Sequence, residues 1–348
     1  MEEKQYLLGM TLAEIEEAVK ELGLPKFTAS QIADWVYVKR VTSIDEMSNI
    51  SLKNRDILNS RFDIGRVNPL EVQTSTDGTK KMLFATRHNN KFIESVTIPE
   101  SDRLTLCVSS QIGCKMNCAF CLTGRMGFSG NLSTNEILNQ VYAVPDAENL
   151  TNIVFMGMGE PLDNYDNVMK AIEILTADYA LAWSPKRITL STIGILPKLK
   201  RFLDESSCHL AISLHSPLSE QRKILMPAEK TYPIEQIIDL LHNYDWTHQR
   251  RLSFEYIMFA GVNDLSVYAR RLVKLLSGLS CRINLIRFHA FPESLLQPSD
   301  EETMIKFRDY LTSKGFICTI RASRGEDIFA ACGMLSTMKK NGDKKIMP

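Results

Sequence analysis

The spacing of apolar and polar residues at the start of the chain predicts helices. Behind a capping box at Thr11, apolar residues recur at every third or fourth position, as in Ile15, Val19 and Leu22. Two more runs with the same period follow. Residues 1–65 are therefore expected to form a small helical domain.

Shorter apolar runs with a β pattern follow this helical region. Within residues 66–99, the runs 81–85 and 92–98 predict a β-hairpin linker. From residue 100 to 340, near-continuous apolar runs alternate with helical stretches, which is typical of parallel strands buried on both faces. Residues 341–348 are expected to be a flexible tail. The predicted parallel strands are 105–109, 153–156, 188–191, 210–214, 252–258, 283–288 and 318–320.

This alternation predicts an α/β fold. Six βα units are too few for a complete eight-stranded barrel, so we interpret the main domain as a partial (β/α)6 barrel. An open doubly wound sheet would give the same pattern. In both architectures, ligands bind at the carboxyl ends of the parallel strands.

Composition and charge favour an enzyme of the cytoplasm. The chain has 348 residues, 44% of them hydrophobic, and its net charge of zero neither favours nor excludes a nucleic-acid partner. Its eight cysteines are too sparse for a secreted disulfide scaffold. No apolar stretch approaches the roughly 18 residues of a membrane span. Neither export nor a membrane partner is expected.

Three closely spaced cysteines, Cys114, Cys118 and Cys121, form a C-x3-C-x2-C run directly after the first predicted strand of the main domain. A closed structural zinc site needs four ligands, and an electron-storage cluster usually has four cysteines. Three thiolates would leave one iron of a four-iron cluster open to a substrate. A zinc site completed by a distant histidine, or simply buried thiols, are the alternatives.

Polar residues also follow the next strands of the predicted barrel. Gly159 and Glu160 come after the second strand, where a missing side chain allows close approach and an acid can accept hydrogen bonds from an ammonium group. Ser191 and the run from Ser213 to His215 end the third and fourth strands. Taken alone, each of these residues fits an ordinary turn or cap equally well.

Five motifs in this order resemble the RlmN/Cfr group of radical S-adenosylmethionine (SAM) RNA adenine methyltransferases, and the likeness extends over nearly the whole chain. The resemblance implies a partial (β/α)6 radical-SAM barrel, one [4Fe-4S] cluster and two SAM molecules per turnover. The motifs are Cys107-Val-Ser-Ser-Gln-Ile-Gly-Cys114, Phe155-Met-Gly-Met-Gly-Glu-Pro161, Arg187-Ile-Thr-Leu-Ser-Thr-Ile-Gly194, Ile212-Ser-Leu-His215 and Arg324-Gly-Glu-Asp-Ile-Phe-Ala-Ala-Cys-Gly333.

The same resemblance assigns the site. It implies that Cys332 carries the methyl group, that Cys107 releases the product through a transient disulfide, and that Glu94 accepts the ring proton. The cluster ligands would be Cys114, Cys118 and Cys121. The residues implied to hold SAM are Gly159, Glu160, Ser191, Ser213, Leu214, His215 and His289, the last standing where the family has an asparagine.

The substrate implied is carbon 2 of an adenine in 23S rRNA and in tRNA, with carbon 8 of the same rRNA adenine as the alternative. An electron donor such as flavodoxin and a monomeric chain are expected. In the helical domain, Trp35, Tyr37, Lys39 and Arg40 are candidate RNA contacts. A radical-SAM enzyme acting on a small molecule, and a zinc-dependent nucleic-acid-binding protein without catalysis, are the competing hypotheses.

Overall fold

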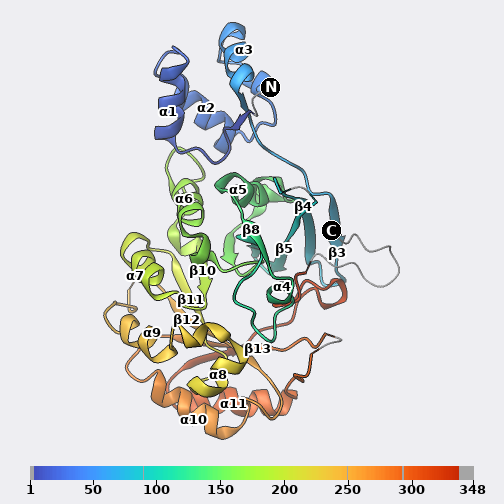
Figure 1. Ribbon diagram of the computed structural model, residues 1–348, viewed down its shortest axis with the longest axis vertical. Coiled ribbons are helices and arrows are strands. Elements are labelled where there is room, and N and C mark those ends of the chain that lie inside the picture. The colour runs from blue at the N-terminus through green and yellow to red at the C-terminus, as the bar shows by residue number, and fades with distance from the viewer. Residues whose placement is uncertain (1–3, 89, 249, 292–293, 337–348) are drawn as a thin grey trace.

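A helical N-terminal module sits at one end of a larger α/β domain (Figure 1). The computed structural model describes residues 4–88, 90–248, 250–291 and 294–336. The predicted tail, residues 341–348, lies outside the described residues.

The first helix begins as the sequence predicts. The Thr11 side chain accepts from the Glu14 backbone N–H, and the Glu14 side chain accepts from the Thr11 N–H, so the capping box is confirmed. Ile15 and Val19 of this helix are buried. The elements of the module are β1 (Gln5–Tyr6), α1 (Leu12–Glu21), α2 (Thr28–Ala33), a π-helical turn (Asp34–Val38), a 3-10 turn (Ile44–Glu46), α3 (Leu52–Arg61) and β2 (Phe62–Asp63).

A ten-stranded sheet forms the frame of the main domain. Its strand order is β14-β13-β12-β11-β10-β9-β6-β5-β4-β3, and neighbouring strands from β6 to β14 are parallel. The predicted parallel strands are confirmed, with ends shifted by no more than two residues. The strands are β3 (Glu71–Thr74), β4 (Lys80–Ala85), β5 (Phe92–Glu100), β6 (Arg103–Cys107), β9 (Asn152–Phe155), β10 (Ile188–Thr192), β11 (His209–Ser213), β12 (Leu252–Met258), β13 (Arg282–Arg287) and β14 (Ile317–Ile320).

The hairpin expected before the main domain is built into this same sheet. Strand β4 pairs antiparallel with β5, and β5 pairs antiparallel with β6, which places Val96 opposite Cys107. Strand β3 adds a further antiparallel edge. The region therefore extends the barrel wall beyond the first parallel strand.

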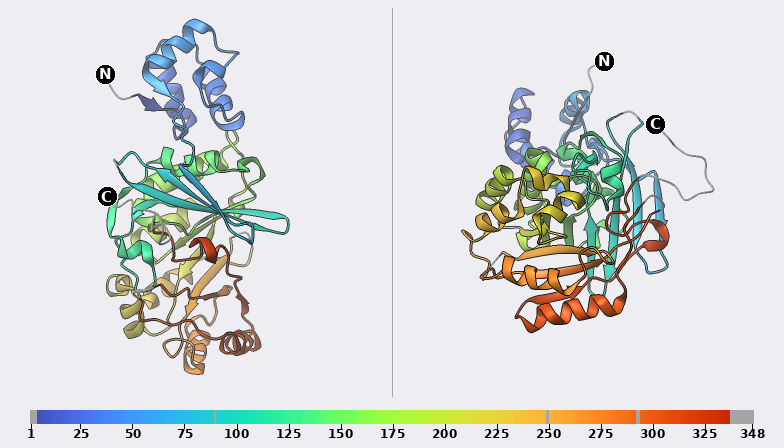
Figure 2. Two further views of the ribbon diagram at one scale, coloured as in Figure 1. Left: turned by 90° about the vertical axis from the view of Figure 1, so that its right-hand side faces the viewer. Right: turned by 60° about the horizontal axis from the view of Figure 1, so that its bottom comes forward.

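The connecting helices cover one face of the sheet, which confirms the partial barrel (Figure 2). Helix α5 packs on α6, α7 on α9 and α10 on α11. An open doubly wound sheet would need helices on both faces. The helices of this domain are α4 (Leu122–Arg125), α5 (Thr134–Ala143), α6 (Tyr165–Thr176), α7 (Leu196–Glu205), α8 (Ser219–Leu225), α9 (Ile234–Leu241), α10 (Ser266–Leu275) and α11 (Glu301–Ser313).

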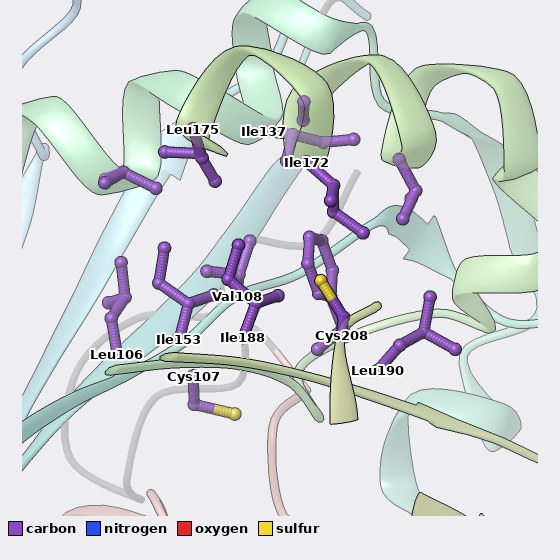
Figure 3. Close-up of a cluster of buried hydrophobic side chains, with 14 of the residues drawn as sticks. Leu106, Cys107, Val108, Ile137, Ile153, Ile172, Leu175, Ile188, Leu190 and Cys208 are labelled. Carbon is purple, nitrogen blue, oxygen red and sulfur yellow. The ribbon is translucent and has the colours of Figure 1, made fainter. Parts of the chain in front are cut away.

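The outer face of the sheet is apolar because it packs on these helices. Figure 3 shows Leu106 and Ile153 pointing towards Ile172 and Leu175 of α6. Cys107 points to the opposite, inner face. Because side chains alternate along a strand, one face of the sheet packs on the helices and forms the hydrophobic core, and the opposite, inner face carries Cys107.

The N-terminal module is fixed to α5 by two asparagines one turn apart. Asn135 Nδ2 donates to the carbonyls of Leu8 and Gly65, both at 2.9 Å. Asn139 accepts from the Val67 N–H at 2.9 Å and donates back to its carbonyl at 2.8 Å. These backbone groups are paired away from water, so the contact specifies one orientation of the module.

Among the described residues, no helix has both the length and the apolar character needed to cross a bilayer.

Candidate active site

The three cysteines of the predicted cluster loop line one cavity at the carboxyl ends of the parallel strands. The loop follows β6 and connects the paired strands β7 (Gln111–Gly113) and β8 (Phe128–Asn131). Helix α4 begins directly after Cys121. The Ala119 N–H donates to the Leu225 carbonyl at 2.9 Å, which ties the loop to the end of α8. The loop geometry brings Cys114, Cys118 and Cys121 together.

Three thiols on one loop are the donor set that a four-iron cluster with one open iron requires. Among the residues that the structure describes, no group of three or more His, Cys, Asp or Glu side chains is arranged to hold a metal ion. Burial raises the pKa of Cys114 to about 12, so a bound metal is needed to hold this group as a thiolate at neutral pH.

The Gly-Glu pair after β9 lines the same cavity. Gly159 has a φ of +101°, and a Cβ at this position would lie 2.5 Å from Gln111 Cβ, so another residue would be strained and crowded. The Glu160 carboxylate accepts from Thr192 Oγ1 at 2.6 Å and from the Ile193 N–H at 2.9 Å. Burial nevertheless raises the pKa of Glu160 to about 7. A cationic ligand would restore its charge.

Ser191, Ser213 and His215 also line this cavity, from the ends of β10 and β11. His215 Nδ1 accepts from the Ile257 N–H at 3.0 Å, which fixes the ring. Burial, with help from the nearby Arg222 charge, lowers the pKa of His215 to about 3, so the imidazole is neutral. A neutral ring with Nδ1 accepting presents Nε2–H as a donor.

Two residues of the predicted SAM set lie outside the cavity lining. Leu214 is fully buried, and its N–H donates to the Glu255 carbonyl at 3.0 Å. His289 follows β13, where its Nε2 lies 3.2 Å from Ser323 Oγ. The side chains of these two residues therefore face the core and the C-terminal segment, respectively.

The two thiols that the resemblance implies for methyl transfer, Cys107 and Cys332, come from distant parts of the chain. Cys332 lines the cavity and is exposed, whereas Cys107 is buried on the inner face of β6. Burial raises the pKa of Cys107, and the charge of Cys332 adds to this effect. Both are free thiols in this structure.

Glu94 approaches the C-terminal segment from β5. It is buried, lies 3.3 Å from Lys81 Nζ and accepts from the Ser336 N–H at 3.0 Å. The carboxylate therefore sits beside the segment that carries Cys332.

Three charged residues around the cavity were missed by the sequence reasoning. Glu255 lines it from β12, and Arg321 Nε lies 3.9 Å from the Glu255 carboxylate. Arg222 is fully buried, pairs with Glu229 and donates to the carbonyls of Ser213 and Leu214 at 2.9 and 3.0 Å. A lone acid inside the apolar strand β12 was a usable signal for Glu255; the sequence contains no comparable signal for Arg222.

The aromatic residues proposed as RNA contacts differ in exposure. Tyr37 is fully buried, and its hydroxyl accepts from the Gly9 N–H at 3.1 Å, so the prediction that it stacks on RNA bases is wrong. Trp35 is partly buried, with Lys39 Nζ 3.8 Å above its ring centroid. Lys39 itself remains at the surface in an ion pair with Asp34.

Comparison with known proteins gives a consistent result. The family profile of the Radical SAM superfamily matches residues 108–269, and that of the ribosomal RNA large subunit methyltransferase N-terminal domain matches residues 5–64. The chain is 60% identical over 343 residues to the probable dual-specificity RNA methyltransferase RlmN of Phocaeicola vulgatus, covering 99% of this chain and 98% of that protein.

A more distant relative and a solved structure agree. The dual-specificity RNA methyltransferase RlmN of Syntrophus aciditrophicus is 44% identical, over 94% of this chain and 95% of that protein. The crystal structure of a radical SAM methyltransferase from Sphaerobacter thermophilus superposes with a TM-score of 0.90 at 38% identity, covering 95% of this chain and 99% of that chain.

Proposed function

We propose that this chain, which belongs to the RlmN family of radical SAM RNA methyltransferases, methylates carbon 2 of an adenine in 23S rRNA and in tRNA. One observation carries the proposal: the cysteine triad, Glu160 and Cys332 all line a single cavity. That cavity lies at the strand ends, where barrel enzymes place their chemistry.

The residues of the cavity have distinct roles in this proposal. Cys114, Cys118 and Cys121 would hold a [4Fe-4S] cluster, which would bind and reduce SAM. Gly159 gives the SAM amino group room to approach, and Glu160 accepts its hydrogen bonds. The remaining SAM contacts proposed are Ser191, Ser213, Leu214, His215 and His289. Ser191, Ser213 and His215 line the cavity. Leu214 would contribute through its backbone.

Cys332 is the proposed methyl carrier. Carbon 2 of adenine is electron-poor and cannot attack the methyl group of SAM, so the methyl is first transferred to the Cys332 sulfur by displacement. A [4Fe-4S] cluster and a second SAM bound in the cavity would supply the radical chemistry that removes a hydrogen atom from this methyl group. The carbon held on Cys332 then adds to the adenine, which joins protein and RNA covalently. The exposure of Cys332 to the cavity supports this role.

Release of the product is assigned to Glu94 and Cys107. Glu94 accepts the proton from the ring carbon. The Cys107 thiolate attacks the Cys332 sulfur and forms a transient disulfide, and the carbon–sulfur bond breaks with its electron pair on the carbon, which takes up a proton to become the methyl group. The single electron left by the radical addition would return to a bound cluster. The position of Glu94 beside the C-terminal segment and of Cys107 on the inner face of β6 supports these roles.

The comparisons lend no support to the other hypotheses. The two relatives are named as RNA methyltransferases and are matched over 98% and 95% of their length, which favours RNA over a small-molecule substrate and catalysis over zinc-dependent binding. Carbon 8 as acceptor is tested directly by mass spectrometry of RNA. We expect 2-methyladenosine in 23S rRNA and tRNA to disappear from cells lacking the gene and to return with the intact chain. The appearance of 8-methyladenosine instead would contradict the proposal.

The proposal extends to the partners of the enzyme. A low-potential electron donor such as flavodoxin is proposed to reduce the cluster. The chain is proposed to act as a monomer. A cytoplasmic location fits eight cysteines that are all free thiols in the structure.

The N-terminal module, residues 1–65, is proposed to hold RNA. Lys39 is its test residue, because this side chain is 43% exposed. Lys39→Glu should weaken RNA binding and lower the slope of log Kd against log salt concentration by about 1, as for one lost phosphate contact. SAM cleavage should not change.

Lys306→Glu is the matched control for this test. Lys306 also forms an exposed ion pair, with Glu302 on α11, at the opposite end of the chain. RNA affinity measured by filter binding over a range of salt should be unaffected by this control. Equal Kd values and salt slopes for Lys39→Glu and the unmodified protein would refute the role of Lys39.

A further inference from the structure

The segment between β14 and the carrier cysteine, residues 323–327, has no role in the chemistry described above. It nevertheless forms a dense set of contacts with the turn between β3 and β4, residues 75–79. Asp327 Oδ1 accepts from Ser75 Oγ at 2.6 Å, and Asp327 Oδ2 accepts from the Thr76 N–H at 3.2 Å. Segments about 250 positions apart in the chain are joined here.

The contact is reciprocal. From the turn, Asp77 Oδ2 accepts from the Gly325 N–H at 3.0 Å, while its Oδ1 accepts from the Thr79 N–H at 2.9 Å. The Arg324 guanidinium lies 4.0 Å from the same carboxylate. Each side thus contributes one aspartate that binds backbone N–H groups, and hydrogen bonds to ionised acceptors are the stronger class.

The backbone at Gly325 requires glycine. Its φ is +62°, and an added Cβ would lie 2.7 Å from Ala330 Cβ and 2.9 Å from Thr79 Cγ2. The turn and the segment therefore approach more closely than a side chain would allow.

His289 supports the segment from a second direction. Its Nε2 lies 3.2 Å from Ser323 Oγ, and its Nδ1 lies 3.8 Å from the Glu326 carboxylate. The residue that replaces the family's asparagine therefore contacts the segment that leads to Cys332.

The residues after Cys332 are held by a second set of hydrogen bonds. The Leu122 N–H donates to the Gly333 carbonyl at 2.8 Å, and Thr123 Oγ1 donates to the Leu335 carbonyl at 2.6 Å. Both donors belong to α4, directly after the last cysteine of the triad. The carrier cysteine thus lies on a short span with a fixed point on each side.

We propose that the contact between residues 75–79 and residues 323–327, which we term the anchor, positions Cys332 for both of its reactions. This inference rests on the proposed role of Cys332 as methyl carrier. Ser75, Asp77 and Asp327 are positioning residues, since they act on the reacting sulfur through the backbone that connects the anchor to it.

The length of the span between the anchor and Cys332 explains why an anchor is needed. Cys332 must meet first the methyl group of SAM and then the adenine. The span of residues 328–332 reaches at most roughly 17 Å when fully extended, so a fixed start confines the sulfur to the cavity. Without the anchor, the start of the span would move and the sulfur would sample positions far from both partners. A misplacement of about 1 Å can cost a hundredfold in rate.

Two substitutions test the anchor. Asp327→Asn replaces one acceptor oxygen by an N–H2 group, which would face the Ser75 hydroxyl or the Thr76 N–H. Ser75→Ala removes one hydrogen bond and is milder, while Ser75→Thr keeps the hydroxyl. We expect kcat for RNA methylation to fall roughly tenfold to hundredfold in Asp327→Asn and less in Ser75→Ala. KM for RNA and SAM, iron content and melting temperature should remain unchanged.

The methyl occupancy of Cys332 gives a readout that general destabilisation would not affect selectively. After incubation with SAM and reductant, peptide mass spectrometry should show less methylated Cys332 in Asp327→Asn and Ser75→Ala, and normal occupancy in Ser75→Thr. Asp309→Asn is the matched control, because Asp309 is an exposed acid on α11 that pairs with its neighbour Arg308. It should behave as the unmodified protein.

The outcomes separate this inference from the proposed function. If Cys332→Ala protein still methylates RNA, Cys332 is no carrier and both the proposed function and the anchor fall. If Cys332→Ala is inactive while Asp327→Asn and Ser75→Ala show normal kcat and normal methyl occupancy, the anchor alone is overturned. Loss of activity in Ser75→Thr as large as in Ser75→Ala would also overturn it, since the hydroxyl is then not what matters.

Discussion

Alanine in place of Cys107 is expected to trap the enzyme covalently on its RNA. The Cys107 thiol is proposed only to resolve the adduct, so methyl loading of Cys332 and attack on the adenine should proceed without it. Turnover should fall to background. Protein isolated from cells should carry RNA, and nuclease digestion should leave a nucleotide on the peptide around Ala331-Cys332-Gly333, detectable by mass spectrometry.

The matched variant for this experiment is Cys332→Ala, which should be equally inactive but free of bound RNA. Cys281→Ala, which removes a thiol that lines no part of the cavity, should retain activity and carry no adduct. Finding only unmodified Cys332 in the Cys107→Ala protein would count against the carrier mechanism.

Loss of any one cysteine of the triad is expected to abolish SAM cleavage. With two thiolates in place of three, a cubane loses one of its protein ligands and the open iron is no longer defined. Cys114→Ala, Cys118→Ala and Cys121→Ala proteins should each purify with little iron, lack the broad absorption near 400 nm expected of an iron–sulfur protein, and form no 5′-deoxyadenosine.

The same Cys281→Ala variant controls for the loss of a thiol as such, and it should keep normal iron content. A triad variant that retained full iron content and normal 5′-deoxyadenosine production would remove that cysteine from the ligand set. Because the loop also packs against α8, circular dichroism should accompany each measurement to show that the fold persists.

Local pattern predicted the elements well. Strand β12 reads Leu-Ser-Phe-Glu-Tyr-Ile-Met, and the structure gives it the predicted bounds because its apolar residues pack on both faces. The Thr11 capping box likewise depends only on side chains within one turn. Such features are decided by neighbours in sequence.

Long-range contacts could not be predicted in this way. Arg222 has the sequence context of an ordinary surface helix, and only the fold brings the Glu229 carboxylate and two strand-end carbonyls around it. Tyr37 was proposed to face RNA, yet its hydroxyl bonds to Gly9, a partner 28 residues away. The pairing of β5 with β6 was hidden for the same reason, since a hairpin does not reveal which sheet it joins.

For the candidate site, the pattern of residues indicated the chemistry but left its details open. The motifs follow successive strands of a parallel sheet, whose carboxyl ends meet at one edge. The triad, Glu160 and Cys332 accordingly line one cavity. His289 is expected to contact SAM from its match to the family's asparagine, and in the structure its ring lies beside Ser323 and Glu326. Strand order fixes the edge at which a residue lies, but side-chain direction is decided by packing.

The hydrogen bonds of the two asparagines on α5 affect whether the helical module can be lost or gained separately from the main domain. Excising the helical module, residues 1–65, would leave the Asn135 amide without the Leu8 and Gly65 carbonyls, whereas Asn139 would keep its partner Val67. Loss of the module would therefore leave a buried amide of the main domain without its hydrogen bonds. The relative from Phocaeicola vulgatus shares 99% of the length of this chain, as expected if both parts descend together.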